Sequence, residues 1–480
     1  MLDVSTAAFW LLLFAAGFAI SGMLYARRRR DDLEDYIVAR NSQTTSATVL
    51  TLLASTLGAW ILFGPAQAAT WGGLGAVIGY ALRAAAPRLA MIPLGRRMRE
   101  LIPEGHTLTE FVVTRYGRVM YGFTLLVMLF YMFIYLAAEI TAIAKLVALL
   151  APVPLWVTAA IVMGATLIYT AYGGLRASIF TDKVQMIVIL PFLLLLLALG
   201  WQAAGGAAPT LAGLQEKAPQ LLDLADPVGL KAGLTFFVAV LLTGLFHQGY
   251  WQRVYAARDA RTMRTGFLLG GLLGVPVIFA TGLFGLAFVG LGTDGDSSVA
   301  LFSVVLSSVP AWFAVALILL GLALVMSSAD TVISGISSII AVDMRRLLPN
   351  AGEAVLMGLS RWLIFLLAIP VMIVAAQGYS VLYLFLLADL FCSAATFPVF
   401  FGLFSRRYDG RIAAISTACG LIAGIALFPG PGDRPVYLLE SFLLAALVPV
   451  AVSALLMLIL PSRRRFDFAD LRTAIRGLGA

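Results

Sequence analysis

The chain has 480 residues, of which 61% are hydrophobic and 12% are charged, and its formal net charge is +8. This composition offers too little polar surface to cover a water-soluble globule, which excludes an ordinary soluble enzyme or binding domain. The sequence contains no Gly-Lys-Ser/Thr phosphate loop and no Cys/His cluster with zinc spacing. We therefore expect an all-α polytopic membrane protein that is not an enzyme and does not use ATP directly.

Apolar runs of membrane length follow one another along the whole chain. Each crossing of a bilayer needs about 20 apolar residues in a helix, and this rule predicts about 13 spans. The predicted spans are 7–26, 46–66, 70–95, 119–150, 154–172, 184–204, 230–250, 265–291, 311–343, 356–377, 380–404, 411–429 and 437–460.

Basic residues gather in alternate loops between these runs, for example at 27–30, 96–99, 253–264, 345–346, 406–407 and 463–465. Loops rich in Lys and Arg stay on the cytoplasmic side, so this pattern predicts an outside amino terminus and a cytoplasmic carboxyl terminus. It also explains the positive charge without a nucleic-acid partner. The first span is followed by RRRRDD and not by a small-residue cleavage site, so we expect it to be retained. We expect Arg88 and Arg361 to snorkel to the interface.

The second predicted span, TLLASTLGAWILFGPAQAA, contains Gly58, Gly64 and Pro65. A break there would leave carbonyls and amides without helical partners at membrane depth, and secondary transporters use such breaks to bind ions. A simple kink is the alternative, because Gly and Pro are common in membrane helices.

The segment 322–344, LALVMSSADTVISGISSIIAVDM, places two hydroxyls and a carboxylate in the middle of an apolar run. Asp330 would cost several kcal/mol at bilayer depth without a partner, so it indicates an ion or solute pathway. For the hydroxyls of Ser327 and Ser328, bonding to the preceding turn or close helix packing is the alternative.

Four further motifs, in order along the chain, carry a family resemblance: TLTEFVVTRYG from Thr107, YTAYGGLRASIFTDKVQMIVI from Tyr169, HQGYWQRVYAARD from His247 and VMSSADT from Val325. Together they resemble the sodium/solute symporter family, which includes proline, sugar, sialic acid, pantothenate and urea transporters. The resemblance implies a leucine-transporter-type fold with a 5+5 inverted-repeat core. On this basis we expect a first helix and cytoplasmic loop at 1–45, repeats at 46–205 and 230–405, an outside loop at 206–229, and two peripheral helices with a tail at 406–480.

The resemblance also implies two ion sites. The main sodium site would use the carbonyls of Ala54, Leu57 and Leu324 with the hydroxyls of Ser327 and Ser328. Neutral oxygens suit a small hard cation that must be released again. A second sodium or proton site, found in some members, would use Asp182, Asp330 and Thr331. Alternatively, Asp182 is an interfacial residue paired with Lys183 or Arg176.

The solute site is expected near the bilayer midplane between the repeats, on core helices one, two, three, six, seven and ten. The resemblance implies Trp60, His247 and Gln248 as candidate residues, and the carboxylates Glu139 and Asp389, which interrupt apolar spans, are two more. For Glu139 a structural pair with Lys145 or Arg83 is favoured over solute contact, whereas Asp389 is equally compatible with either role. If either carboxylate faces the cavity, a cationic or zwitterionic solute is favoured over an anionic one.

These features predict a sodium-coupled symporter of a bacterial inner membrane that imports a small polar organic solute, such as an amino acid or a urea- or amine-like compound, by alternating access. Protons could replace sodium as the coupling ion. A sensor module of the same fold that acts with a partner protein, or an uncoupled facilitator, are the alternatives. The expected partners are the solute and the lipid bilayer, and the protein could be a monomer.

Overall fold

The computed structural model describes residues 2–27, 32–306, 310–431, 436–460 and 465–475. Within these ranges the chain is helical and forms no β-strand, apart from a single parallel bridge between Gln43 and Ala257. Ten helices of the described chain are long and apolar enough to cross a membrane. The polytopic all-α prediction agrees with this, while the predicted count of about 13 is not confirmed. The basic runs at 28–30 and 463–464 lie outside the described residues.

The first half of the chain forms these helices in order: α1 (Val4–Arg27), α2 (Leu33–Ile37), α3 (Thr45–Ala54), the 3-10 turn η1 (Ala59–Leu62), α4 (Gly64–Leu82), α5 (Ala86–Leu101), α6 (Leu108–Tyr116), α7 (Arg118–Leu150), α8 (Leu155–Ala203), α9 (Ala207–Lys217) and η2 (Pro219–Leu222). The second half forms α10 (Pro227–Thr243), η3 (Gly244–Phe246), α11 (Gln248–Ala256), α12 (Ala260–Leu272), α13 (Gly274–Gly290), η4 (Ser297–Val299), α14 (Ala300–Val305), α15 (Ala311–Leu347), α16 (Glu353–Ala376), α17 (Val381–Phe400), η5 (Phe401–Leu403), α18 (Gly410–Ile425), α19 (Leu438–Ile459) and α20 (Ala469–Ala474).

Helix breaks explain why these helices do not match the predicted spans one to one. The second predicted span is interrupted after Ala54 and resumes at η1. α4 is kinked at Gly73, whose φ of 55° is a left-handed conformation that glycine adopts without strain. α8 has 49 residues, about 73 Å if it were straight, and is kinked at Gly174, where φ is 54°. The predicted spans 154–172 and 184–204 therefore lie on either side of one kink.

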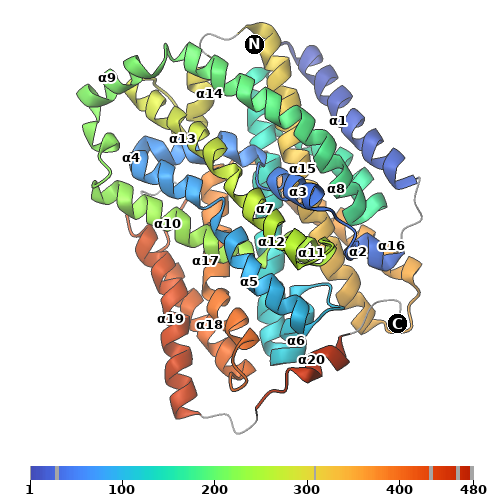
Figure 1. The fold of residues 1–480 in the computed structure, drawn as a ribbon. Coiled ribbons are helices and arrows are strands. Elements are labelled where there is room, and N and C mark those ends of the chain that lie inside the picture. The colour runs from blue at the N-terminus through green and yellow to red at the C-terminus, as the bar shows by residue number, and fades with distance from the viewer. Residues whose placement is uncertain (1, 28–31, 307–309, 432–435, 461–464, 476–480) are drawn as a thin grey trace.

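The long helix α15 lies at the centre and packs against α7, α8, α16 and α1. In Figure 1, α1 lies on one flank beside α8, while α18 and α19 form the opposite flank. The broken helix α3 packs between α12 and α8, and it also contacts α15. This arrangement brings the break after Ala54 next to the polar segment of the central helix.

Candidate functional site

The break after α3 is held open by a buried carboxylate. The helix ends at Ala54, and Gly58 precedes the 3-10 turn η1. Glu139, from α7, accepts a hydrogen bond from the Ala59 amide at 2.8 Å. A Cβ atom at Gly58 would collide with the Glu139 carboxylate, so a larger residue there would have to displace it. The expected break therefore exists, and it is more than a simple kink.

The carbonyl oxygen at the end of α3 meets the serine pair of α15. Ser327 Oγ lies 3.3 Å from the Ala54 oxygen and 3.0 Å from the Leu324 oxygen. Ser328 Oγ lies 3.1 Å from the same Leu324 oxygen. Both hydroxyls thus also bond to their own preceding turn, as expected for serine in a membrane helix. Leu57 is buried and its amide donates to the Leu53 oxygen. Oxygens from two helices therefore converge here.

Asp330, three residues beyond Ser327, accepts hydrogen bonds from three hydroxyls of α8. Tyr169 and Ser178 each donate at 2.7 Å, and Thr181 donates at 2.9 Å. The carboxylate is completely buried. These bonds provide the partners that a carboxylate needs at this depth, and they join the central helix to α8.

The neighbouring carboxylate, Asp182, faces a guanidinium group. Asp182 is completely buried and accepts a hydrogen bond from Thr51. Arg253 NH2, from α11, lies 3.3 Å from Asp182 Oδ2 and 2.8 Å from Thr331 Oγ1. The alternative of an interfacial Asp182 paired with Lys183 or Arg176 is wrong, because Arg176 pairs with Asp35 instead, at 2.5 Å.

Arg253 also corrects the topology prediction, which placed it in a basic loop. Its side chain is 1% exposed, and its Nε and NH2 groups donate to Thr51 Oγ1 at 3.1 and 2.9 Å. The guanidinium therefore lies between the oxygens of Asp182, Thr51 and Thr331. It stands where the second cation site was predicted.

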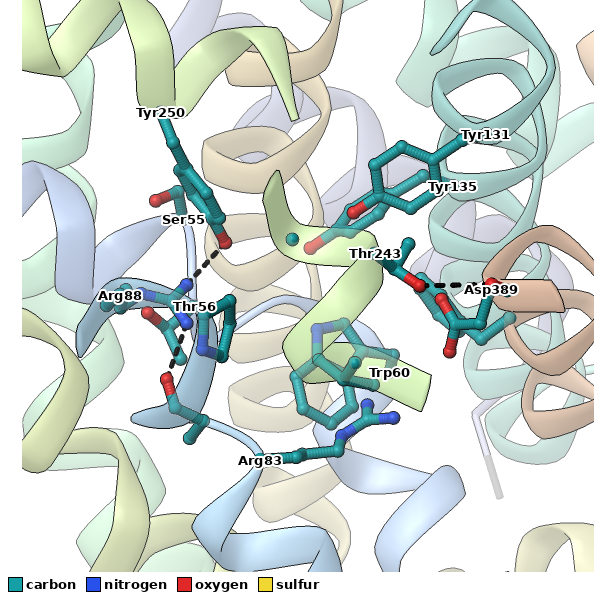
Figure 2. Close-up of a pocket in the computed structure, with 15 residues that line it drawn as sticks. Ser55, Thr56, Trp60, Arg83, Arg88, Tyr131, Tyr135, Thr243, Tyr250 and Asp389 are labelled. Carbon is teal, nitrogen blue, oxygen red and sulfur yellow. Dashed lines mark hydrogen bonds between the residues drawn. The ribbon is translucent and has the colours of Figure 1, made fainter. Parts of the chain in front are cut away.

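A small cavity opens beside the break, with a volume of about 40 Å³, room for a few water molecules. Figure 2 shows its polar and aromatic lining. The lining residues are Ser55, Thr56 and Trp60 at the break of α3, Arg83 and Ala84 in the turn after α4, Pro87 and Arg88 at the start of α5, Tyr131 and Tyr135 on α7, Val240, Thr243, Gly244 and Tyr250 around η3, and Phe385 and Asp389 on α17. Five of the six core helices that were expected to line the solute site contribute residues. The sixth of these, core helix seven at 265–291, contributes none.

Two arginines of the lining had other roles in the predictions: Arg88 was expected to snorkel, and Arg83 was a possible partner of Glu139. Arg88 does not snorkel: it is 3% exposed, and it donates to the Ala84 oxygen at 2.6 Å and to the Tyr250 hydroxyl at 2.5 Å. Arg83 lies in the turn between α4 and α5. The guanidinium carbon of Arg83 lies 4.4 Å from the ring centroid of Trp60. Arg361 is partly buried and donates to the Ala171 oxygen at 2.7 Å, so its snorkelling stays a prediction.

Of the five predicted solute residues, Trp60 and Asp389 line the cavity, and the other three do not. The ring of His247 stacks on Tyr250 at 4.4 Å, and its Nδ1 accepts from the Gly249 amide. Gln248 points toward the α6 side, where its amide donates to the His106 oxygen at 2.8 Å. Glu139 is bound to the backbone of the break; the predicted partner Lys145 donates instead to Ser298 at 3.0 Å.

The residues that sequence reasoning missed are the basic and tyrosine side chains of the interior: Arg83, Arg88, Arg253, Tyr131, Tyr135, Tyr169 and Tyr250. One signal could have found Arg253, because it lies in the same motif as His247 and only six residues after it. For Arg83 and Arg88 the sequence ALRAAAPRLA shows only that Pro87 can restart a helix.

Comparison with known proteins agrees with this architecture. A spermidine transporter of Candida albicans, DUR31, is 24% identical over 432 residues, covering 87% of this chain and 79% of the relative. The sodium/pantothenate symporter of Escherichia coli is 28% identical over 280 residues, covering 56% of this chain and 57% of the relative. A solved Na⁺-coupled sialic acid symporter, in a substrate-bound outward-open state, superposes with a TM-score of 0.76 at 18% identity, covering 96% of this chain and 99% of that one.

The family model described as the sodium:solute symporter family matches residues 36–420, which is most of the chain. The structural neighbours, which include a nucleobase-cation symporter with a TM-score of 0.58, share the leucine-transporter-type fold. This chain therefore belongs to the sodium:solute symporter family and is a transporter, not an enzyme.

Proposed function

We propose that this protein is a sodium-coupled symporter that imports a small polar organic solute by alternating access. Family membership supports solute symport. The observation that carries the sodium coupling is the approach of Ser327 Oγ to the Ala54 carbonyl, 3.3 Å apart on two different helices.

The proposed sodium site combines the carbonyls of Ala54, Leu57 and Leu324 with the two serine hydroxyls. The last carbonyls of a helix lack partners in a following helical turn, and at the end of α3 the Ala54 oxygen accepts from the Ser327 hydroxyl of another helix. A hydroxyl that now bonds to a backbone oxygen can instead turn a lone pair toward a cation. Neutral oxygens bind a small hard cation without holding it too tightly for release.

A cation at this place would tie the short helix α3 to the central helix α15. Sodium binding would thereby favour one arrangement of the proposed repeats, 46–205 and 230–405, and raise the affinity for solute in that state. Linkage requires solute to raise the affinity for sodium by the same factor. We propose an outside amino terminus and a cytoplasmic carboxyl terminus. Sodium is then released on the cytoplasmic side, because its concentration is low there.

We propose a single sodium site, because the guanidinium of Arg253 already lies between Asp182 and Thr331. A second cation would have to approach this fixed positive charge at close range. Asp330 meanwhile accepts from three hydroxyls. In this proposal Asp182, Asp330 and Thr331 hold the core helices together and bind neither sodium nor a transported proton.

Sodium alone provides a test that needs no knowledge of the solute. We expect NaCl, but not equal KCl or choline chloride, to raise the thermal unfolding temperature of the purified protein, because a ligand of the folded state stabilises it by RT ln(1 + [Na⁺]/Kd). Ser327→Ala and Ser328→Ala should each lower the sodium affinity about tenfold or more, so a higher NaCl concentration is needed for the same stabilisation. Ser338→Ala is the matched control, since the bond of this α15 serine within the described part of the chain goes to the Gly335 oxygen of its own helix, at 2.8 Å.

A sodium effect that survives unchanged in both serine variants would contradict the site. Stabilisation by protons or potassium in place of sodium would contradict sodium coupling. Solute uptake into proteoliposomes that proceeds equally with and without a sodium gradient would show a facilitator, and solute binding without any uptake would indicate a sensor.

A further inference from the structure

The cavity beside the α3 break contains fixed charges of both signs. Arg83, Arg88 and Asp389 are 4%, 3% and 2% exposed, and all three line it. Burying an ionic group away from water costs several kcal/mol unless it is paired and hydrogen-bonded. The partners of each charge therefore show which of them a solute must satisfy.

Arg88 is already bonded within the protein through both of its terminal nitrogens, although its Nε has no hydrogen-bond partner. Its NH1 donates to the Ala84 oxygen and its NH2 to the Tyr250 hydroxyl. Its guanidinium carbon also lies 4.8 Å from the Tyr250 ring centroid. We therefore assign Arg88 a structural role on the side of the cavity that faces Tyr250.

Arg83 and Asp389 are not satisfied in this way. The guanidinium carbon of Arg83 lies 3.7 Å from the Tyr80 ring centroid and 4.4 Å from that of Trp60, and, unlike that of Arg88, this guanidinium donates no hydrogen bond to any described residue. Asp389 Oδ2 likewise has no partner. In Figure 2 the guanidinium of Arg83 lies next to the Trp60 ring, and Asp389 lies on the α17 wall of the same cavity. Each group presents an open position for a charge of opposite sign.

From this pairing we infer that the solute is a small zwitterion, whose carboxylate binds Arg83 and whose cationic nitrogen binds Asp389. The inference rests on the proposed symport function and specifies its substrate class. A neutral solute such as urea or a sugar would leave Arg83 and Asp389 with only their attraction for each other across the cavity, since no salt bridge joins them in the described part of the chain. A polyamine would place several positive charges beside two arginines, and a simple anion would leave Asp389 unpaired.

The aromatic lining suits the same class of solute. Trp60, Tyr131, Tyr135 and Phe385 line the cavity, and the rings of Tyr135 and Phe385 meet edge to face with centroids 5.0 Å apart. Aromatic faces attract cationic nitrogen, including methylated nitrogen. The volume of about 40 Å³ holds only a few water molecules, so even a compact zwitterion requires the lining to widen when it binds.

The test is a binding panel on the purified full chain, measured by thermal shift in NaCl and in choline chloride. The probes are L-alanine, L-proline and glycine betaine as zwitterions, urea and glucose as neutral solutes, propionate as an anion, and ethylamine and spermidine as cations. We expect stabilisation by zwitterions in sodium, with alanine binding at least about tenfold more tightly than propionate or ethylamine, each of which lacks one charged group.

Two variants assign the charges. In Asp389→Asn, alanine should lose about tenfold or more in affinity and approach propionate, because the amino group has lost its counterion. In Arg83→Gln, the affinity for alanine should fall toward that for ethylamine, because the carboxylate has lost its counterion. Asp343→Asn is the matched control and should leave both ratios unchanged, since Asp343 pairs with Arg346 on α15.

The panel on the unmodified protein decides the matter even if a variant fails to fold. Sodium-dependent binding of urea, glucose, propionate or spermidine with no response to the zwitterions would overturn the solute assignment while leaving sodium symport intact. No response to any zwitterion would overturn it as well. Zwitterion binding that is equally strong in choline chloride would support the assignment and contradict sodium coupling.

Discussion

Glu139 acts as the acceptor that the Ala59 amide would otherwise find in a continuous helix. The carboxylate and the amide are both buried, and their hydrogen bond is 2.8 Å long. Glu139→Ala should destabilise the protein by about 1–3 kcal/mol, because the amide loses its only acceptor away from water. Glu139→Gln keeps an acceptor oxygen and should retain most of the stability. Thermal unfolding in detergent measures both, and equal losses in the two variants would contradict this role.

Arg253 and Asp182 form a second buried pair, from α11 and α8. Arg253→Gln should cost about 3–5 kcal/mol, because it leaves the Asp182 carboxylate buried without a counterion. Asp182→Asn in the same chain should recover part of that loss, since it removes the unpaired Asp182 charge and leaves Asp330, which three α8 hydroxyls hold, as the neighbouring carboxylate. Unfolding of the two single variants and the double variant gives the coupling energy. Additive losses would show that the two side chains do not stabilise each other.

Polar residues in an apolar run could be found from the sequence, whereas buried basic residues could not. Ser327 and Asp330 could be found because a polar or charged side chain at bilayer depth is costly in free energy and is therefore usually functional or paired. Arg88 and Arg253 lie near the ends of their spans, where positive charge is ordinarily explained by topology or snorkelling. Their partners, Tyr250 and Asp182, are 162 and 71 residues away in sequence. A pattern of neighbouring residues cannot predict contacts between side chains so far apart in the sequence.

At the scale of elements, α11 is clamped by two segments of the chain that precede it. Residues 41 and 43 bond to the backbone of Tyr255 and Ala256 at 3.0 and 2.9 Å. Gln248, at the start of α11, donates to the His106 oxygen. The side chain of His106 is in turn held between two carboxylates, with Glu34 2.6 Å from Nε2 and Glu110 3.3 Å from Nδ1. Because both ring nitrogens face carboxylates, the cluster favours the imidazolium form.

This cluster predicts a dependence of stability on pH. Burial alone would lower the pKa of His106, but the two carboxylates outweigh it and raise that pKa to about 9. A group with a raised pKa stabilises the fold fully below its unfolded pKa of about 6.5 and loses that contribution as the pH rises toward 9. Although burial opposes it, His106 lowers the pKa values of Glu34 and Glu110, so their contribution is lost as the pH falls below about 4.5.

We therefore expect the unfolding temperature to fall as the pH rises from about 6.5 to 9, and His106→Asn to remove most of this slope. The measurement is thermal unfolding in detergent at half-unit pH steps. Ser338→Ala, at the buried α15 serine, should keep the slope of the unmodified protein. A slope that persists in His106→Asn would assign the titration to another group.

The breaks in the elements were predictable in part. Gly58, Gly64 and Pro65 indicated an interruption of the second span, and the helix does end at Ala54. The turn at residues 83–85, which brings Arg83 to the cavity, had no such signal beyond Pro87. It follows the packing of α4 against α10 and α13, and such long-range contacts override local propensity.

At the scale of the whole molecule, the number of sodium ions per solute determines how far the solute can be concentrated. The proposed single site, with Arg253 in place of a second cation, predicts a ratio of one sodium per solute. One sodium crossing a 100 mV potential and a tenfold gradient provides about 3.7 kcal/mol, enough for roughly 500-fold accumulation of a solute without net charge. Two ions would permit roughly 10⁵-fold accumulation under the same conditions.

Proteoliposomes with imposed potential and sodium gradients can measure this limit with the zwitterion that binds best. We expect accumulation to stop near a few hundredfold, and initial uptake to follow sodium concentration with a Hill coefficient near 1. Ser328→Ala should abolish sodium-driven accumulation, because the only proposed site is weakened, whereas Ser338→Ala should not. A Hill coefficient near 2, or accumulation far beyond a thousandfold, would require a second ion and would contradict the assignment of the Asp182 region to Arg253.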